Sequence, residues 1–213
     1  MSITFEAFLL FDRIVVEDTP QKTQSAIRDE SDAALVVRSQ SGEPSAFEEL
    51  VRRYRNDVFG LSYHYLRDRE EAWDVSQEVF IKAFRSLGRF RGDAGFKTWL
   101  LRITANHCKD FFKKRRLKTV SIDAMPTQDF IPAVSDPGRD LANTELGQAI
   151  QLALEGISPK HRLAFVLREL EGMSYKEMAE VMNCSEGTVM SRLHHARKKL
   201  QAKLVTMGYM EAG

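Results

Sequence analysis

The stretch "SYKEMAEVMNCSEGTVMSRLHHARKKL" (residues 174–200) predicts two short helices joined by a tight turn. Ser174 and Glu177 form a capping box that begins the first helix. The segment "NCS" (183–185) turns the chain, and the Ser185 hydroxyl can cap the second helix. Because the second helix is basic and follows after so short a turn, this stretch is typical of a helix-turn-helix that binds duplex DNA.

The second helix divides into a core face and an outward face. With about 3.6 residues per turn, one narrow apolar stripe carries Val189, Leu193, Ala196 and Leu200. Gly187 lies on the opposite face, where a missing side chain lets a phosphate or base edge approach the backbone. A solvated basic helix with an incidental glycine is the alternative. We expect phosphate contacts from Thr188, Arg192 and Arg197, base contacts from Ser191, His194 and His195, and further contacts from Met190 and Lys198.

Length and composition indicate a globular protein of one or two domains. The 213 residues suit one moderate domain or two small ones, and a hydrophobic content of 43% is enough to build cores. Cys108 and Cys184 lie far apart without metal-ligand spacing, which indicates neither disulfides nor zinc and favours a reducing, cytoplasmic compartment. The apolar run "ITFEAFLLFDRIVV" (3–16) is short and interrupted by charges, so we expect neither a membrane anchor nor a signal peptide.

The net charge of +1 conceals two strongly basic segments. Residues 97–118 are basic with Asp110 as their single acid, and residues 190–203 carry lysines and arginines with no acid. The excess of acidic residues lies in residues 1–50 and 119–146. Two separated basic faces suggest two contacts with a polyanion.

Helical periodicity is interrupted once between residue 45 and the end of the chain. The stretch "VSIDAMPTQDFIPAVSDPGRD" (120–140) collects prolines, glycine and acids, which breaks the pattern. After it, "ISPKHRLAFVLRELEG" (157–172) predicts a helix capped by Ser158 and ended by Gly172. We therefore expect an all-α chain of two helical domains joined by a flexible linker. The expected limits are an extension of unknown role at 1–30, a first domain at 31–117, a linker at 118–139 and a second domain at 140–213.

A long helix in the first domain, "TWLLRITANHCKDFFKKRR" (98–116), carries two apolar stripes and a polar line between them. The stripes run through Trp99, Ile103, His107 and Phe111, and through Leu101, Ala105, Cys108 and Phe112. The polar line predicts a rigid track for a nucleic-acid backbone, with Asn106 able to read a base. The track consists of Arg102, Asn106, Lys109 and Lys113, and Lys97 lies one turn before it.

The loop before this helix, "RFRGDAGFKTW" (89–99), places aromatic residues beside glycines. Phe90 and Phe96 could there receive an unstacked base. A place in the core is an equally good interpretation for Phe96 and Trp99.

The preceding helix, "EEAWDVSQEVFIKAFRSL" (70–87), should bury Ala72, Val75, Val79 and Ala83. Its outer face should expose Ile81 among polar groups, which is typical of the centre of a protein–protein contact. A solvated face with one stray isoleucine is the alternative. The polar groups are Asp74, Gln77, Glu78 and Arg85.

Two long motifs, in this order, resemble the extracytoplasmic-function (ECF) sigma factors of bacterial RNA polymerase. They are "DVSQEVFIKAFRSLGRFRGDAGFKTWLLRITANHCKDFFKKRR" (74–116) and "LEGMSYKEMAEVMNCSEGTVMSRLHHARKKL" (170–200). The resemblance implies that the first domain is sigma region 2 and the second is region 4. The first thirty residues exceed the usual start of the family, and their role is open. His194 and His195 depart from what is frequent in the family, which leaves the preferred minus-thirty-five sequence open. Met190 replaces a residue that is frequently basic, which would weaken duplex binding.

The resemblance also implies roles for individual residues. Asp74, Gln77, Glu78 and Phe80 fall on the helix that docks on the polymerase clamp coiled coil, with Ile81 beside them. The loop 90–95 and the helix bearing Ile103 and Asn106 fall where the minus-ten element is melted and a flipped base is held. The basic end "KKRR" (113–116) falls on spacer-proximal phosphates, and the last domain's helix reads the minus-thirty-five element.

These expectations define a sigma factor with no catalytic residue, metal or cofactor, located in the cytoplasm. Its expected partners are core RNA polymerase (clamp coiled coil and flap) and promoter DNA, both duplex and melted, with an anti-sigma factor as a further candidate and no membrane insertion. The main alternative is a free-standing helix-turn-helix regulator that binds duplex DNA without polymerase. A nucleic-acid enzyme using Asp74 and Glu78 as metal ligands is disfavoured, because no further acid or histidine converges on them in the sequence.

Overall fold

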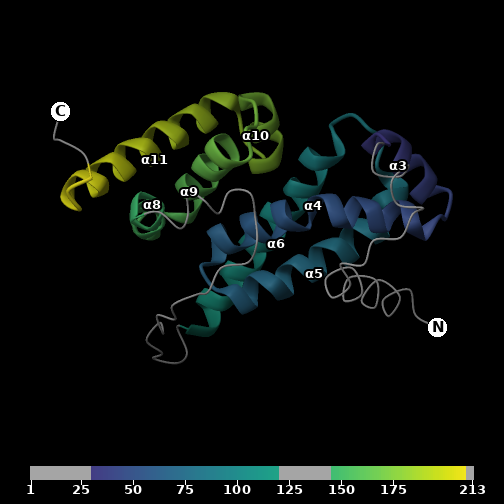
Figure 1. The fold of residues 1–213 in the computed structure, drawn as a ribbon, viewed down its shortest axis with the longest axis horizontal. Helices are drawn as coiled ribbons and strands as arrows, with labels where there is room; N and C mark the ends of the chain where they lie inside the picture. The colour runs from purple at the N-terminus through teal and green to yellow at the C-terminus, as the bar shows by residue number, and fades with distance from the viewer. Residues whose placement is uncertain (1–29, 120–144, 210–213) are drawn as a thin grey trace. The chain divides into compact units, whose positions relative to one another are not determined.

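The computed structural model describes residues 30–119 and 145–209, and every regular element in these two ranges is a helix (Figure 1). The prediction of an all-α chain is confirmed. The chain divides into two compact units, Met1–Cys108 and Lys109–Gly213, so that the boundary falls inside one long helix. The extension (1–30) and the linker (118–139) lie almost entirely outside the described residues, and the domain limits expected from the sequence stay a prediction.

The first unit is a helical bundle around α4. Its helices α3 and α5 both pack on α4. The start of the last long helix, α6, also contacts α4, because the rings of Tyr54 and Phe96 lie 5.5 Å apart and Lys97 Nζ lies 2.6 Å from Asp57 Oδ1. The elements are α3 (Asp32–Gln40), α4 (Pro44–Leu66), α5 (Arg69–Ser86), the short 3-10 helix η1 (Leu87–Arg89) and α6 (Phe96–Thr119), of which the part up to Cys108 belongs to this unit.

Capping groups set where these helices begin and end. Ser31 accepts a hydrogen bond from the Ala34 N–H at the start of α3, and Asp68 accepts one from the Glu71 N–H at the start of α5. Arg67 ends α4 in the left-handed region, with φ of 62°. This reversal separates α4 from α5 by only two residues, so the two helices pack against each other.

The predicted core face of α5 is confirmed, since Ala72, Val75, Val79 and Ala83 are all buried. On α6 the buried residues are Phe96, Thr98, Leu100, Leu101, Thr104, Ala105 and Cys108. The stripe that was expected to be packed through Trp99, Ile103, His107 and Phe111 is only half-buried. It lies on the flank of α6, beside the buried ridge, rather than facing the centre of the bundle.

The second unit is built around α11, which packs against α8, α9 and α10. Within it, the helix expected to run up to Gly172 is divided. Its α-helical turns end at Phe165 and continue as a π-helical turn, where the Glu171 N–H donates to the Val166 carbonyl. Gly172 then ends the element with φ of +67°. The elements are α8 (Glu145–Glu155), α9 (Pro159–Phe165), η2 (Val166–Leu170), α10 (Tyr175–Met182) and α11 (Glu186–Thr206).

The predicted helix-turn-helix is present in α10 and α11. Both hydrogen bonds of the Ser174–Glu177 capping box are formed at the start of α10. Asn183 turns the chain with φ of 51°, and the Thr188 N–H donates to Ser185 Oγ at 3.3 Å to cap α11. The predicted core stripe is confirmed, and its members Val189, Leu193, Ala196 and Leu200 are buried. None of the helices in the described part of the chain combines the length and apolarity needed to span a bilayer.

Leu101→Ala should lower the free energy of unfolding of the first unit by about 2–5 kcal/mol, because it leaves a cavity at a fully buried position. Both tryptophans, Trp73 and Trp99, lie in this unit, so tryptophan fluorescence during urea denaturation reports on it. The control Arg102→Ala, at the exposed neighbouring position, should change the free energy by less than about 0.5 kcal/mol. Equal losses in the two variants would contradict the assigned core face.

Candidate nucleic-acid interfaces

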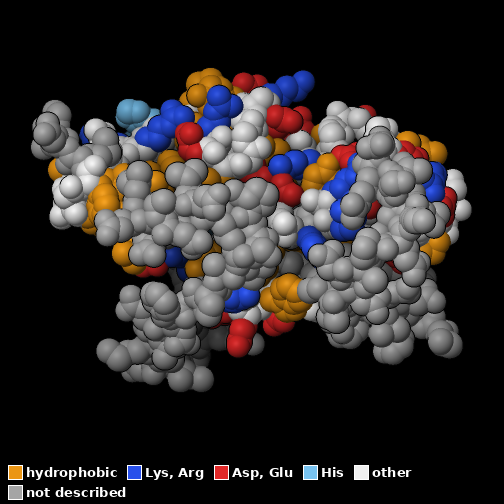
Figure 2. All heavy atoms as spheres, in the orientation of Figure 1, with side chains coloured by type: hydrophobic (Ala, Val, Ile, Leu, Met, Phe, Trp, Pro, Cys, Tyr) orange, Lys and Arg blue, Asp and Glu red, His pale blue; other side chains and the backbone are white. Residues whose placement is uncertain are grey.

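The outward face of α11 is exposed as the sequence predicted. Figure 2 shows histidine side chains beside lysine and arginine side chains on the surface of this helix. A Cβ added to Gly187 would meet nothing within 4 Å, so packing inside the chain does not require glycine there. The small residue therefore leaves room for something outside the protein. The exposed residues of this face are Gly187, Met190, Ser191, His194, His195, Arg197 and Lys198.

Two of the arginines expected on phosphates already contact groups of the protein. Arg197 Nη2 lies 2.5 Å from Glu169 Oε1, and Nε of the same arginine donates to this oxygen at 3.1 Å. Arg192 is half-buried, and its Nη1 donates to Cys184 Sγ at 3.6 Å. A phosphate would have to compete with Glu169 for Arg197, whereas the thiol is a weak acceptor that Arg192 can exchange readily.

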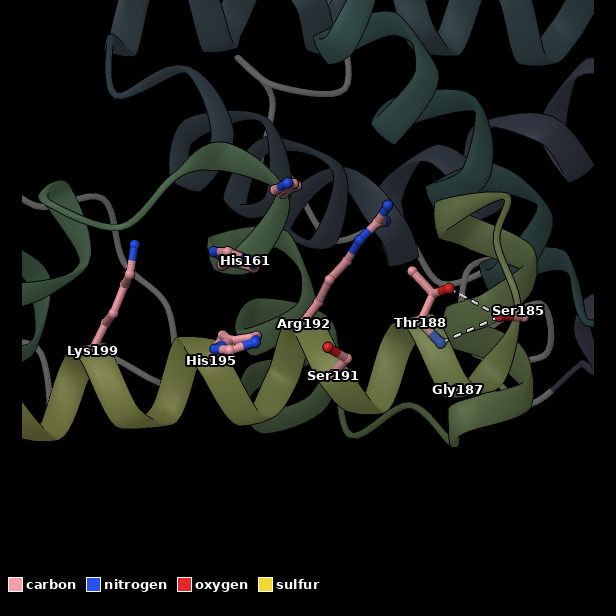
Figure 3. A pocket seen from close by; sticks show the side chains of 9 residues that line it. His161, Ser185, Gly187, Thr188, Ser191, Arg192, His195 and Lys199 are labelled. Carbon is pink, nitrogen blue, oxygen red and sulfur yellow. Dashed lines mark hydrogen bonds between the residues drawn. The ribbon is translucent and has the colours of Figure 1, made fainter.

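A hollow lies between the start of α9 and the middle of α11 (Figure 3). The side chains of Arg192, His195 and Lys199 rise from α11 on the side that faces α9, and His161 lies opposite His195. The rings of these two histidines are 5.7 Å apart. The complete lining is Lys160, His161, Ser185, Gly187, Thr188, Ser191, Arg192, His195 and Lys199.

Sequence reasoning missed Lys160, His161 and Lys199 as members of this site. Lys160 and His161 belong to the first turn of α9, far from the recognition helix in sequence, and no local pattern marks them. The packing of α9 on α11 brings them to the same surface. Burial lowers the pKa of His161 below its usual range, and the neighbouring cations Lys160, Lys199, His195 and Arg192 lower it further.

The polar line along α6 is present on one side of this helix. Arg102, Asn106 and Lys113 are exposed, while Ile103 and Lys109 are half-buried. Because successive members lie on one face of a helix whose opposite side is packed, their spacing is fixed. Such a row of cations and one amide can follow a phosphate backbone and donate or accept at a base edge.

Aromatic rings form a cluster at the loop before α6. The ring of Phe90 lies 6.0 Å from that of Phe96 and 5.0 Å from that of Trp99, and Phe96 and Trp99 are 5.6 Å apart. Phe96 is only 4% exposed, so its alternative place in the core is the one observed. Phe90 and Trp99 are half-buried at the edge. Gln40 Nε2 holds the start of the loop by donating to the carbonyls of Leu87 and Phe90 at 2.9 and 3.0 Å.

The outer face of α5 differs in two respects from the expectation. Asp74 and Glu78 are exposed and Gln77 is half-buried, but Ile81 is half-buried rather than exposed. Phe80, however, is 3% exposed, so its side chain lies in the core rather than on this face. Phe80 is buried together with its neighbour Val79 and with Ala83. The buried side of α5 is therefore wider than the stripe predicted from the sequence.

Glu78 also has a neighbour on the next helix. Its Oε2 lies 2.6 Å from His107 Nε2 of α6, which ties the outer edge of α5 to α6. Lys97, another residue of the expected minus-ten contact, is paired with Asp57. Among residues 30–119 and 145–209, no three or more histidine, cysteine or carboxylate side chains form a group that could hold a metal ion.

Comparison with known proteins gives two family matches, sigma-70 region 2 over residues 50–118 and sigma-70 region 4 over residues 147–200. The RNA polymerase sigma-H factor of Pseudomonas aeruginosa is 37% identical over 182 residues, which cover 82% of this chain and 94% of that protein. The ECF RNA polymerase sigma-E factor of Escherichia coli is 38% identical over 181 residues, with the same coverage.

Two solved structures resemble the chain. CnrH in complex with the cytosolic domain of CnrY has a TM-score of 0.57 at 26% identity, and the match covers 83% of this chain and 99% of that one. The sigma factor RpoE of Bartonella quintana, solved in complex with the anti-sigma factor NepR, has a TM-score of 0.65 at 24% identity. That match covers 74% of this chain and 96% of RpoE, and shows the likeness of fold.

Glu169→Gln should raise the affinity for duplex DNA roughly two- to fivefold, because it removes the carboxylate that competes with phosphate for Arg197. Fluorescence anisotropy of the full chain with a labelled duplex at low ionic strength measures this. Glu70→Gln, an exposed carboxylate of α5, makes the same change in net charge and serves as the control. If both variants gained equally, the effect would be one of net charge and the assignment of Arg197 to the DNA face would lose its support.

Proposed function

Because the chain belongs to the ECF sigma factors of the sigma-70 family, we propose that it binds core RNA polymerase, directs it to promoters and promotes their melting. The observation that carries this proposal is the 37–38% identity to sigma factors over 82% of the chain, which includes both helical units. A free-standing helix-turn-helix regulator would share only the last of these units with them. The sigma function is therefore favoured over that alternative.

In this proposal α11 reads the minus-thirty-five element. Its exposed face enters the major groove, where Ser191, His194 and His195 meet base edges and Arg192 and Arg197 hold phosphates. The open space at Gly187 supports a close approach of the backbone near the start of α11. The remaining proposed contacts are Thr188, Met190 and Lys198.

The face of α6 and the aromatic cluster before it would hold the melted minus-ten strand. Unstacking a base costs a few kcal/mol, and stacking on an aromatic ring offsets part of that cost. Phe90 and Trp99 are half-buried at the edge of the cluster, whereas Phe96 supports them from the core. The polar residues assigned to this strand are Lys97, Arg102, Asn106, Lys109 and Lys113, with Ile103 between them.

The outer face of α5 would bind core polymerase through Asp74, Gln77, Glu78 and Ile81, on the clamp coiled coil. Phe80 would act indirectly, since its buried ring fixes the packing of α5. The flap is the proposed contact of the second unit. Half-buried Ile81 within a polar ring supports this use of the face, because interface centres combine an apolar anchor with a polar rim.

The two DNA contacts would act together through the polymerase. Each unit offers a handful of phosphate contacts, and such contacts weaken steeply with salt. Holding both units on one enzyme makes the second contact effectively intramolecular. Promoter specificity then arises from requiring both elements at one spacing, with the proposed domains at 31–117 and 140–213 and the linker between them.

We extend the proposal to the setting in which the chain works. It would act in the cytoplasm, where the polymerase is, and as a DNA-recognition factor without catalytic activity of its own. An anti-sigma protein is a further proposed partner. The structure of CnrH, 26% identical and solved with the cytosolic domain of CnrY, supports the idea that a chain of this fold can be held by another protein.

Asn106→Ala should reduce open-complex formation by about tenfold or more, because it removes the amide of the α6 polar line, which can bond a base of the melted strand. Run-off transcription with purified core polymerase on genomic fragments identifies a promoter, and permanganate footprinting on it measures melting. Polymerase binding, measured by co-migration with the core enzyme, should stay unchanged. Equal loss of melting and polymerase binding would contradict the assignment of Asn106.

Ile81→Glu should have the opposite pattern and weaken binding to core polymerase by about tenfold or more, because a charge replaces the apolar centre of the contact. Competition with labelled wild-type chain for core enzyme measures the loss. Since Ile81 is half-buried, urea denaturation followed by tryptophan fluorescence should accompany the assay to show that the bundle is intact. An intact variant with wild-type affinity would remove this face from the proposed interface.

A further inference from the structure

The hollow between α9 and α11 gathers basic side chains from two helices, and not from α11 alone. Lys160 and His161 enter it from α9, and Arg192, His195 and Lys199 enter it from α11. No carboxylate is part of the lining that the structure describes. Hydroxyl groups of Ser185, Thr188 and Ser191 complete it. A concave surface of cations and hydroxyls without an acid is suited to an oxyanion such as phosphate.

The two histidines occupy the same part of this hollow. Their rings lie 5.7 Å apart at an angle of 41°, so one anion can contact both. Ser158 Oγ lies 2.9 Å from His161 Nδ1, which fixes the orientation of that ring. His194 packs edge-on against His195 from outside the hollow, with ring centroids 5.7 Å apart.

The charged groups around His161 all oppose its protonation in the free chain. Burial and then Lys160, Lys199, His195 and Arg192 lower its pKa, so the imidazole is neutral near pH 7. In the described part of the chain, the hollow is lined only by residues of α9, of α11 and of the cap before α11. The charged residues of the neighbouring element η2 are not part of this lining. Glu169 pairs with Arg197, and Arg168 Nη1 donates to the Met173 carbonyl at 2.7 Å.

We propose that this hollow binds one phosphate of the duplex backbone, and that the His161–His195 pair takes up a proton as the phosphate binds. The proposal rests on the assignment of α11 to duplex DNA, adds α9 to that contact, and assigns His195 to a phosphate rather than to a base edge. Its consequence is that the affinity of this chain for duplex DNA rises as the pH falls from about 8 to about 6, across the range in which histidine titrates.

The direction of this pH dependence follows from the charge of the bound phosphate. A bound phosphate supplies negative charge beside the imidazoles, which raises their pKa relative to the free chain and makes binding take up protons. An increase of one unit in the pKa of one histidine corresponds to about tenfold in affinity once the pH lies below the free value. Lysine and arginine remain charged throughout this range, so they contribute to affinity without contributing to its pH dependence.

The test measures affinity of the full chain for a short fluorescein-labelled duplex by anisotropy, at about pH 6 and about pH 8 and constant ionic strength. Wild type should bind several-fold more tightly at the lower pH, and His161→Gln should abolish most of that difference. His107→Gln is the control, because His107 lies in the other unit and is not among the residues assigned to DNA, and it should keep the pH dependence. Retention of the full dependence by His161→Gln, or an equal loss in His107→Gln, overturns the proposal.

A second measurement uses the unaltered chain, so that it does not depend on the folding of a variant. Imidazole NMR signals are followed with pH in the absence and presence of the unlabelled duplex. The pKa of His161 should rise on binding, while the imidazole signals of His107, in the other unit, should not respond to the duplex. Unchanged values for His161 overturn the proposal. Failure of wild type to direct core polymerase in run-off transcription would instead remove the sigma function and leave this phosphate site standing.

Discussion

The recognition surface depends on the burial of one narrow stripe of α11. Val189, Leu193, Ala196 and Leu200 pack into the second unit and fix the rotation of the helix about its axis. Because they occupy a single line, most of the helix circumference remains available to a ligand. The same packing places α9 alongside α11, and so determines which side chains of α9 can join the DNA face.

The long helix α6 obeys a similar constraint in the first unit. Its ridge of Leu100, Leu101, Thr104, Ala105 and Cys108 is buried, and this leaves Arg102, Asn106 and Lys113 in a row on the exposed side. In both units, therefore, a rigid helix is held by apolar packing and presents a polar face. Preorganised groups of this kind lose little conformational entropy when they bind, which favours recognition by a few side chains.

Features encoded locally could be predicted from the sequence, and features that depend on tertiary packing could not. The caps at Ser174 and Ser185 and the stripes of α5 and α11 follow from spacing along one helix, and they were predicted correctly. The pairing of His161 with His195, and the Tyr54 hydroxyl bonded to Asp32 of α3, join residues of different helices. Likewise the burial of Phe80 follows from how far the packed side of α5 extends, which a helical wheel does not determine.

Three of the cations expected on DNA already contact other groups of the protein, which limits how tightly each unit can bind. Arg197 bonds Glu169, Lys97 bonds Asp57 and Arg192 bonds Cys184. A phosphate that recruits one of them replaces an existing interaction, so the net free energy gained per contact is smaller than the contact itself. Weak individual contacts of this kind make each unit a poor DNA binder alone. They acquire useful affinity when a larger assembly holds both units on the same promoter.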